Sequence, residues 1–531
     1  MEDGADKKQT KKEETPAPVD EEEVHITKYG RPAAVYQPGQ FEAEHHFYIK
    51  VLNAQIHPLV AHFFRLGNKR IVSRYCHLYP NVNAATLTKL LEYKPEIFRW
   101  AGADLFNVTE AHGGRKMVVV ETNSCPSGQK SMPLLNEEEE AGGYRILMER
   151  TFKPYILEQE KRGLLPEGGL AVVYDKNKME ASGYAAVLAD TFSEEVYLVE
   201  YYERDENPAV RWTKDWIMEV KTKDGVWHPI RAAFRYVTQK PWNRFPVVSR
   251  GTLLINPVVA CLAGGRNKLV AAKAYEFFNS QYEKDGLVIR TPETIRDVSA
   301  AEIPLYVQKF GGHAVVKIPY LNAGQGVYTI TSKEELQALM KDLERNDYPY
   351  KQFIVQSLVG NSSWSSTTHE GQYFHVGTIP DKNDNIYAVD IRMMVHYDFT
   401  KHAFRPIAVY SRRARKPLKP QLVPGEDSWA CLGTNLSVKQ SADGWSTETN
   451  RLLLMDTRDF NRLGVGTDDL IDAYIQSVLA SVAIDKLAKK LLSHTDENPL
   501  LSEFNMDLFR SLVKDDGLVE EVEAGQLVNQ E

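Results

Sequence analysis

The sequence predicts a mixed α/β (α+β) protein in which helices and strands alternate along 531 residues. Two observations predict this class. Segments with helical spacing of apolar residues alternate with short runs rich in β-branched and aromatic residues. Hydrophobic residues make up 43% of the chain and charged residues 26%, which is typical of a folded core with a polar surface. The length favours two or more domains or one large multi-lobed unit.

Five segments have the pattern of helices, namely 47–66, 179–192, 267–282, 332–345 and 472–493. The fourth begins with Ser332, a favourable capping residue. Strand-like runs lie between them, at 116–122, 169–176, 196–203, 229–237, 313–320, 326–330, 352–359 and 386–398. No internal repeat is found, so these elements are expected to form sheets covered by helices.

Charge and cysteine content exclude several classes of protein. The net charge of −8 does not favour nucleic acid or an anionic membrane as a partner. The four cysteines form no CxxC pair, so neither a zinc site nor a disulfide framework is predicted, and a reducing compartment is favoured. No apolar run has the length of a membrane helix, and the charged N-terminus does not resemble a secretory signal. A cytoplasmic protein is therefore expected.

Carboxylate and amide side chains at two predicted strands indicate a metal site. An apolar run ends in Glu121 and Asn123, one residue apart, and Asp104 follows a short segment of small residues upstream. Oxygen ligands of this kind suit a hard cation such as Mg²⁺. A second Glu-x-Asn pattern, at Glu503 and Asn505, competes for this role. We prefer the first because Asp104 and a Pro-Ser-Gly turn accompany it.

Two lysines indicate phosphate binding. Lys317 ends a strand and is followed by a turn of small residues, and Lys268 lies near the start of a helix after Gly-Gly. Glycines let backbone N–H groups approach an anion, and a helix N-terminus attracts one. The alternatives are an ordinary hairpin and a surface lysine. The strand ending at 356–358 can offer backbone groups to an adenine edge, although a core strand fits equally well.

Arginines at strand ends add positive charge. Arg392 follows Asp390 in an apolar strand, and Arg412 and Arg413 end the next strand. Guanidinium groups bind phosphate and carboxylate through paired hydrogen bonds. The alternative is a structural Asp–Arg pair with solvated arginines.

Taken together, these segments resemble the ATP-grasp superfamily. In that family two lysines and a glycine-rich loop hold ATP between two lobes, and an Asp and a Glu-x-Asn on neighbouring strands bind Mg²⁺. Here the Glu-x-Asn precedes the lysines, which resembles the circularly permuted branch that includes eukaryotic glutathione synthetase. The resemblance is limited to short, separate segments between roughly residues 95 and 415. That enzyme has an arginine before the aspartate where this chain has Ala103, so glutathione itself is not expected.

The resemblance implies an ADP-forming ligase that joins a carboxylic acid to an amine through an acyl phosphate. It implies catalytic Arg235, Arg392 and Arg413, and a substrate site of Ser127, Gly128 and Arg235. It implies Mg²⁺ at Asp104, Glu121 and Asn123. The implied ATP contacts are Lys268, Lys317, Asn322, Gly324, Gln325, Gly326, Gln356, Ser357 and Leu358.

Two other functions stay open, a small-molecule kinase and a nucleotide-binding protein without catalysis. The expected partners are a small acid and an amine, such as an amino acid or peptide, with no nucleic acid and no membrane. A homodimer is compatible with the sequence.

Motif order and charge divide the chain into six parts. They are a disordered charged tail (1–23), an N-terminal part with the metal-binding strands (24–160), a substrate region (161–285), a small lobe over ATP (286–345), a C-terminal ATP-grasp part (346–515) and an acidic tail (516–531).

Overall fold

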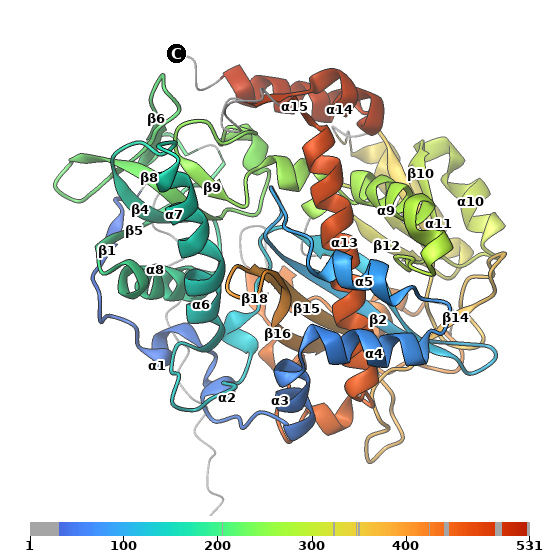
Figure 1. Cartoon of the computed structure of the whole chain (residues 1–531). Helices are drawn as coiled ribbons and strands as arrows, with labels where there is room; N and C mark the ends of the chain where they lie inside the picture. The colour runs from blue at the N-terminus through green and yellow to red at the C-terminus, as the bar shows by residue number, and fades with distance from the viewer. Residues whose placement is uncertain are drawn as a thin grey trace, which may run out of the picture.

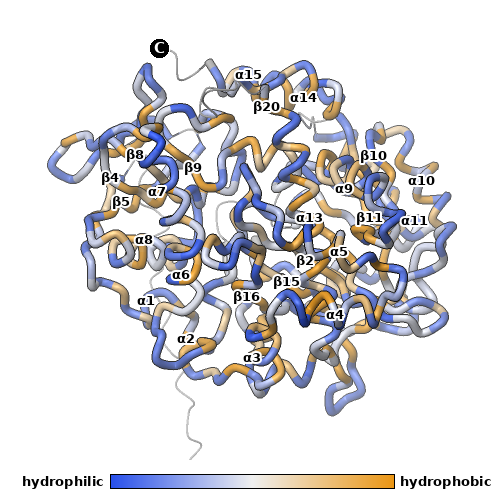
Figure 2. Tube along the Cα trace, viewed as in Figure 1, coloured by the Kyte–Doolittle hydropathy of each residue, from blue (hydrophilic) through white to orange (hydrophobic). Residues whose placement is uncertain are grey.

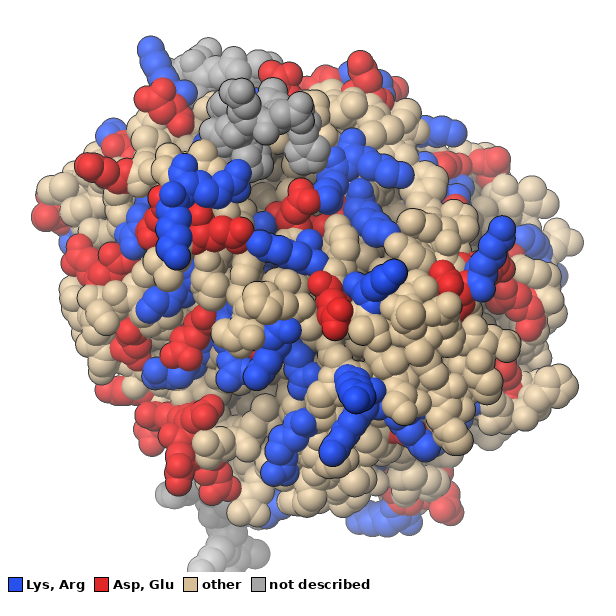
Figure 3. All heavy atoms as spheres, viewed as in Figure 1, with Lys and Arg blue, Asp and Glu red and all other residues tan. Residues whose placement is uncertain are grey.

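Three main sheets with helices around them make up the fold, so the predicted mixed α/β class is confirmed (Figure 1). The computed structural model describes residues 31–203, 205–321, 324–346, 348, 351–423, 425–439, 445–493 and 502–527. The predicted disordered tail, 1–23, lies outside these ranges. Within them, no helix is both long and apolar enough to cross a membrane. Acidic and basic side chains are interspersed over the face seen in Figure 3.

The six-stranded sheet carries the predicted metal-binding segment. Its strands are all antiparallel, and β2 pairs with β3 on one edge and with β15 and β14 on the other. The bounds are β2 (Trp100–Glu110), β3 (Arg115–Asn123), β14 (Tyr373–His375), β15 (Val389–Asp398), β16 (Ala403–Arg413) and β19 (Leu452–Leu453).

The four-stranded sheet is antiparallel and carries the predicted phosphate hairpin, with order β10-β13-β11-β12. Its members are β10 (Thr294–Val298), β11 (Ala314–Lys317), β12 (Val327–Ile330) and β13 (Phe353–Ser357), covered by α10 (Ile303–Lys309) and α11 (Lys333–Arg345). The predicted cap of α11 is present, because the Ser332 hydroxyl accepts from the Glu335 N–H at 3.2 Å. This sheet includes β13, so it extends beyond the expected lobe at 286–345.

The seven-stranded sheet has a parallel centre, in which β4 lies between β5 and β8. Its strands are β1 (Ala34–Tyr36), β4 (Gly169–Tyr174), β5 (Val196–Glu200), β6 (Val210–Trp212), β7 (Met218–Lys221), β8 (Trp227–Tyr236) and β9 (Leu253–Ile255). The helix α8 (Lys178–Phe192) packs against β4 and β5. Four short strands form two separate pairs, β17 (Ser437–Lys439) with β18 (Trp445–Thr447), and β20 (Leu492–Ser493) with β21 (Glu503–Phe504).

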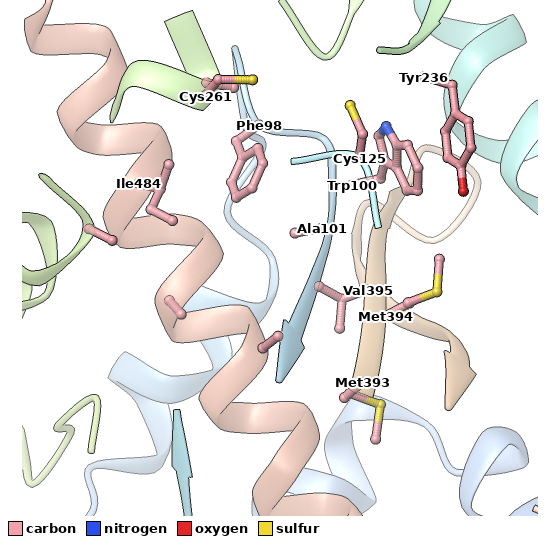
Figure 4. Packing of buried hydrophobic residues seen from close by; sticks show 14 of the residues in the cluster. Phe98, Trp100, Ala101, Cys125, Tyr236, Cys261, Met393, Met394, Val395 and Ile484 are labelled. Carbon is pink, nitrogen blue, oxygen red and sulfur yellow. The ribbon is translucent and has the colours of Figure 1, made fainter. Parts of the chain in front are cut away.

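The long helix α13 (Thr467–Lys490) is the centre of the core. It is buried on all sides between the six-stranded sheet, α9 (Lys268–Tyr282) and three N-terminal helices, α3 (Pro58–Arg65), α4 (Asn68–Leu78) and α5 (Ala84–Leu91). Figure 1 shows α4 and α5 in front of α13, and in Figure 2 the orange, apolar residues are concentrated inside the molecule. Figure 4 shows Ile484 of α13 beside Phe98, while Trp100 lies toward Tyr236 on the opposite side.

Two predicted elements differ from the structure. The single helix expected at 47–66 is two helices, α2 (Ile49–Leu52) and α3, because Pro58 has no N–H to donate and disfavours helical geometry before it. The acidic tail at 516–531 includes a helix, α15 (Asp516–Leu527), which buries Leu518 and Val522. The remaining helices are α1 (Ala43–His46), α6 (Gly142–Leu147), α7 (Lys153–Lys161), α12 (Ser428–Leu432) and α14 (Met506–Val513).

Candidate active site

Charged residues of opposite sign gather on one face of the six-stranded sheet. Asp104 lies directly opposite Glu121 on β3 and opposite Arg392 on β15, and Asp390 lies opposite Arg412 on β16. Residues that face each other across strands share one side of a sheet. The register therefore brings together segments about 300 residues apart in the chain.

Asp104 is held by two arginines. Its carboxylate oxygens accept from Arg392 Nε at 2.6 Å and Nη2 at 2.7 Å, and from Arg412 Nη2 at 2.8 Å. Burial alone would raise the pKa of this carboxyl, but the two guanidinium groups outweigh it and lower the pKa. The same contacts raise the pKa of Arg392 and Arg412 despite their burial. Asp104 is thus a carboxylate that fixes two arginines in place.

Glu121 and the two predicted lysines converge beside this cluster. Lys268 Nζ lies 3.3 Å from Glu121 Oε1 and donates to the Leu321 carbonyl at 2.7 Å. Burial would raise the pKa of Glu121, but Lys268 and other nearby cations lower it. Burial and Lys268 lower the pKa of Lys317 to about 8. Among the described residues, the Lys317 ammonium has no hydrogen-bond or ion-pair partner, so it is available for a ligand.

A cavity with about 840 Å³ of empty volume lies between the six-stranded and four-stranded sheets. Its charged lining residues include Asp104, Glu121, Lys268, Lys317 and Arg412. Its other lining residues are mainly apolar and include Phe106, Val315, Val327, Leu358, Val359, Trp429 and Leu432, with His375 among them. A wall that combines apolar side chains with two lysines suits a nucleoside phosphate. We refer to it as the nucleotide cavity.

The predicted adenine strand lines this cavity with Gln356, Ser357 and Leu358. However, the Ser357 N–H donates to the Glu293 carbonyl at 2.8 Å, and the Leu358 N–H donates to Ser366 Oγ at 2.6 Å. Those two N–H groups are therefore not free for a base edge. Burial lowers the pKa of the nearby His375 to about 4, so its ring is neutral near pH 7.

A second cavity, with about 810 Å³ of empty volume, adjoins the first. We call it the acid cavity. The two cavities share the lining residues Asp104, Glu121, Arg412 and Asn435. Further cations line the acid cavity, namely Lys130, Lys176, Arg266 and Arg392. Burial, together with Arg266, lowers the pKa of Lys176 to about 8. Cations outnumber carboxylates along its wall, so this cavity suits an anion.

Of the three residues predicted to meet the substrate, Ser127 lines the acid cavity, whereas Gly128 and Arg235 do not. Arg235 has no exposed surface and lines neither cavity, because its Nε donates to the Asn256 carbonyl and its Nη1 to the Val237 carbonyl, each at 2.7 Å. Ser127 lines the acid cavity, but its hydroxyl donates to Glu180. The Gly128 N–H also donates to Glu180, at 2.8 Å, so this turn offers no free N–H at Gly128.

Arg413 also points elsewhere. Successive side chains of a strand face opposite sides of the sheet, and it is Arg412 that faces the cavities. The Arg413 guanidinium lies 4.6 Å from the centre of the Tyr387 ring and lines neither cavity. Of these two neighbouring arginines, Arg412 therefore lines both cavities and Arg413 lines neither.

In the predicted phosphate turn, Gly324 lines the nucleotide cavity, while Gln325 is exposed and Gly326 accepts from the Ile318 N–H. Asn322 lies outside the described residues. Gly324 has φ +77°, and a Cβ there would lie 2.4 Å from the Asn435 amide. Only glycine fits this close approach.

The competing pattern at 503–507 lies far from both cavities. Glu503 is exposed, and the Asn505 side chain caps α14 by accepting from the Leu508 N–H at 2.9 Å. Neither residue lines the nucleotide cavity or the acid cavity. The choice of Glu121 and Asn123 therefore fits the geometry better.

Several cavity residues were not predicted. Lys176 follows β4 by two residues and Arg266 precedes the cap of α9, so each lies at an element end where functional side chains are common. Lys130 lies in a short 3₁₀ helix (Gln129–Ser131), with its Nζ 3.3 Å from the Asn177 amide oxygen. No pattern in the sequence distinguishes Lys130 from a surface lysine.

The donor set fits a magnesium ion through Glu121 and Asn123. Both line the acid cavity and carry side-chain oxygens, and the buried Nδ2 of Asn123 has no hydrogen-bond partner among the described residues that would hold the amide in its orientation. Asp104 does not fit, because its two oxygens are engaged by arginines. Among the described residues, no cluster of three or more Asp, Glu, His or Cys side chains could hold a metal. Mg²⁺ commonly takes one or two protein ligands plus phosphate and water.

Comparisons with known proteins gave structural matches only. No family model matches the chain, and no curated protein matches it. A glutathione synthetase-like effector from Globodera pallida has 10% identity and a TM-score of 0.33, over 67% of this chain and 81% of its own. An ATP-grasp RimK domain protein from Sphaerobacter thermophilus has 12% identity and a TM-score of 0.26, over 45% of this chain and 90% of its own.

A further match is D-alanyl-alanine synthetase A from Vibrio cholerae, at 11% identity and a TM-score of 0.27, over 51% of this chain and 94% of its own. At these scores the matches carry no argument about activity, and the circular permutation stays a prediction. The function is therefore argued from the geometry of the two cavities.

Proposed function

We propose that this chain is an ATP-dependent, magnesium-dependent ligase of the ATP-grasp type that joins a carboxylic acid to an amine and releases ADP and phosphate. One observation carries the proposal. A cavity lined by apolar side chains and two lysines adjoins a cation-rich cavity, and the two share Asp104 and Glu121. A nucleotide in the first and an acid in the second would place the γ-phosphate beside the carboxylate.

In the nucleotide cavity, the base lies against Phe106 and the neutral ring of His375, and the phosphates lie against Lys268 and Lys317. The Lys317 ammonium has no hydrogen-bond or ion-pair partner among the described residues, so it gains one when phosphate binds. Glu121 and Asn123 would hold Mg²⁺, which would neutralise charge on the phosphates. Phosphoryl transfer depends mainly on such positioning and neutralisation.

In the acid cavity, Lys130, Lys176 and Arg392 would hold the substrate carboxylate. Asp104 keeps Arg392 and Arg412 in fixed orientations, so they need no reorganisation when charge moves between the cavities. A carboxylate oxygen attacks the γ-phosphorus, and the bond to the ADP oxygen breaks. The amine nitrogen then attacks the acyl carbon, phosphate leaves, and the amine loses a proton.

The test is a screen for phosphate release over pairs of small acids and amino acids, with hydroxylamine as a substitute amine. A ligase releases equal amounts of ADP and phosphate when both substrates are present, and hydroxylamine yields a hydroxamate. The matched variants are Lys176→Gln, which should raise KM for the acid far more than for ATP, and Arg413→Gln, which should leave both unchanged. A stable phosphorylated product with no hydroxamate would replace this proposal with a kinase.

A further inference from the structure

A third cavity lies apart from the active site and shares no lining residue with the nucleotide cavity or the acid cavity. It has about 880 Å³ of empty volume. It is bordered by α7, by β9 and by Leu492 just beyond the end of α13, elements that lie in the upper half of Figure 1. Its apolar wall consists of Ile97, Val248, Leu253, Leu254, Pro257 and Val259.

A buried arginine lines this cavity without an anion. Arg99 is 5% exposed, and its guanidinium carbon lies 3.4 Å from the centre of the Tyr155 ring. Its Nε is buried and has no hydrogen-bond partner. Among the described residues, no acidic side chain forms an ion pair with it. Buried charges are normally paired because desolvation is costly, so a missing anion is the simplest account.

The nearby acids are already paired. Glu158 accepts from Lys94 at 2.9 Å, and Glu96 accepts from Lys489. Lys94 and Glu96 are exposed and Glu158 and Lys489 are half-buried, whereas Arg99 is buried. The acids at the rim therefore do not neutralise the arginine.

The backbone of Arg99 is fixed in place. Its N–H donates to Asn256 Oδ1 at 2.9 Å, and its carbonyl accepts from the Tyr397 N–H at 2.8 Å. The ring of Tyr155 covers one face of the guanidinium, which leaves its edges for an acceptor. A planar guanidinium presented in this way suits a carboxylate, which accepts two parallel hydrogen bonds.

We propose that this cavity is a second ligand site, which binds a small carboxylate with an apolar body. The carboxylate pairs with Arg99, and the aliphatic or aromatic part lies against the Leu253 and Leu254 wall. The site is independent of the ligase reaction, since it shares no residue with either active-site cavity.

The experiment uses 6-bromohexanoate as the probe and 6-bromohexanamide as its neutral match. Isothermal titration of the full chain should show binding of the acid and at least about tenfold weaker binding of the amide, because only the acid can pair with the arginine. Anomalous diffraction from crystals soaked with the acid should place bromine within this cavity.

Variants of Arg99 test whether the acid binds through this side chain. Arg99→Gln should weaken binding of the acid roughly ten- to a hundredfold, and Arg99→Lys should weaken it less. Arg345→Gln, at an exposed position outside this cavity, should leave binding unchanged. If Arg99→Gln does not fold, the comparison of acid binding with amide binding by the unmodified chain still tests whether the carboxylate is recognised. Equal affinity for acid and amide, unchanged affinity in both Arg99 variants, or bromine found only in the acid cavity would overturn the proposal.

Discussion

Lys317 is the residue through which pH should act on nucleotide binding. Its pKa of about 8 lies below the ordinary 10.5, because burial and then Lys268 disfavour the charged form, while Glu121 and Asp104 favour it. The ammonium is therefore charged below about pH 8 and neutral above it. We predict that ATP affinity, measured by calorimetry, falls as pH rises through 8.

The matched variants separate charge from packing. Lys317→Met should weaken ATP binding roughly ten- to a hundredfold at pH 7 and remove most of the pH dependence of this affinity. Lys317→Arg keeps its charge at high pH and should bind ATP with little change between pH 7 and 9. Normal ATP affinity in Lys317→Met would mean that this hairpin is only structural.

Glu121 should be essential for turnover but not for folding. It contributes charge between the two cavities rather than apolar packing. We predict that Glu121→Gln lowers turnover by at least about a hundredfold, as for other groups that stabilise charge in a transition state. The measurement is ADP release, with circular dichroism to check the fold. Glu503→Gln is the control and should keep full activity, and a fully active Glu121→Gln would contradict the proposed site.

At the residue scale, side-chain type and strand position were enough to single out several residues that lie together in the structure. Asp104, Glu121, Lys268 and Lys317 converge because each ends or occupies a strand or helix that the pattern identified. The choice between Arg412 and Arg413 required the register of β16 against β15, which hydrophobicity does not set when both faces of a strand are buried. The burial of Arg235 likewise depends on a parallel sheet assembled from distant segments.

At the scale of elements, Asp485 of α13 anchors the segment that leads into β2. Its Oδ1 accepts from the N–H groups of Ile97 and Phe98, each at 2.7 Å, and its Oδ2 accepts from the Tyr93 hydroxyl at 2.6 Å. Its side chain has no exposed surface. We predict that Asp485→Ala destabilises the fold by about 3 kcal/mol, because two buried N–H groups lose their acceptor.

Urea unfolding measures this effect. Asp485→Asn keeps one acceptor oxygen and should lower the free energy of unfolding by only about 1 kcal/mol. Tyr93→Phe should lower it by a similar amount. A loss below about 1 kcal/mol in Asp485→Ala would mean that water replaces the carboxylate.

The hairpin between β11 and β12 should change its dynamics when ATP binds. Gly324 lines the nucleotide cavity, and the backbone after it can donate to phosphate. We predict slower amide hydrogen exchange at residues 324–328 with ATP and Mg²⁺ than without them, while β13 stays unchanged. Equal protection at 324–328 in both states would show that phosphate does not contact this turn.

At this scale, helices and strands with a clear hydrophobic pattern could be predicted from the sequence. The positions at which such an element is interrupted were harder to predict. The lysine helix α9 and the hairpin strands occur where expected, since glycines and caps mark their ends. The division at Pro58 was missed because apolar spacing continues across it. The order of strands in the six-stranded sheet could not be read from periodicity, because it joins residues near 104, 373 and 412.

At the scale of the whole molecule, the nucleotide cavity exists only when both sheets are folded and in contact. Its lining comes from three separate regions of the chain, 104–121, 268–359 and 375–435. A ligand that binds only the folded state stabilises it by an amount that grows with the ratio of its concentration to Kd, about 2.7 kcal/mol at a hundredfold excess over Kd. ATP with Mg²⁺ should therefore stabilise both sheets together.

We predict that ATP and Mg²⁺ at about a hundred times Kd raise the Tm in scanning calorimetry by a few degrees and keep a single transition. Lys317→Met, at the same ATP concentration, should lose between about half and most of this shift, because its Kd is roughly ten- to a hundredfold weaker. Arg413→Gln should keep the full shift, because its side chain lies outside the cavity. Two transitions, of which ATP moves only one, would mean that the four-stranded sheet unfolds independently and that nucleotide contacts come from that sheet alone.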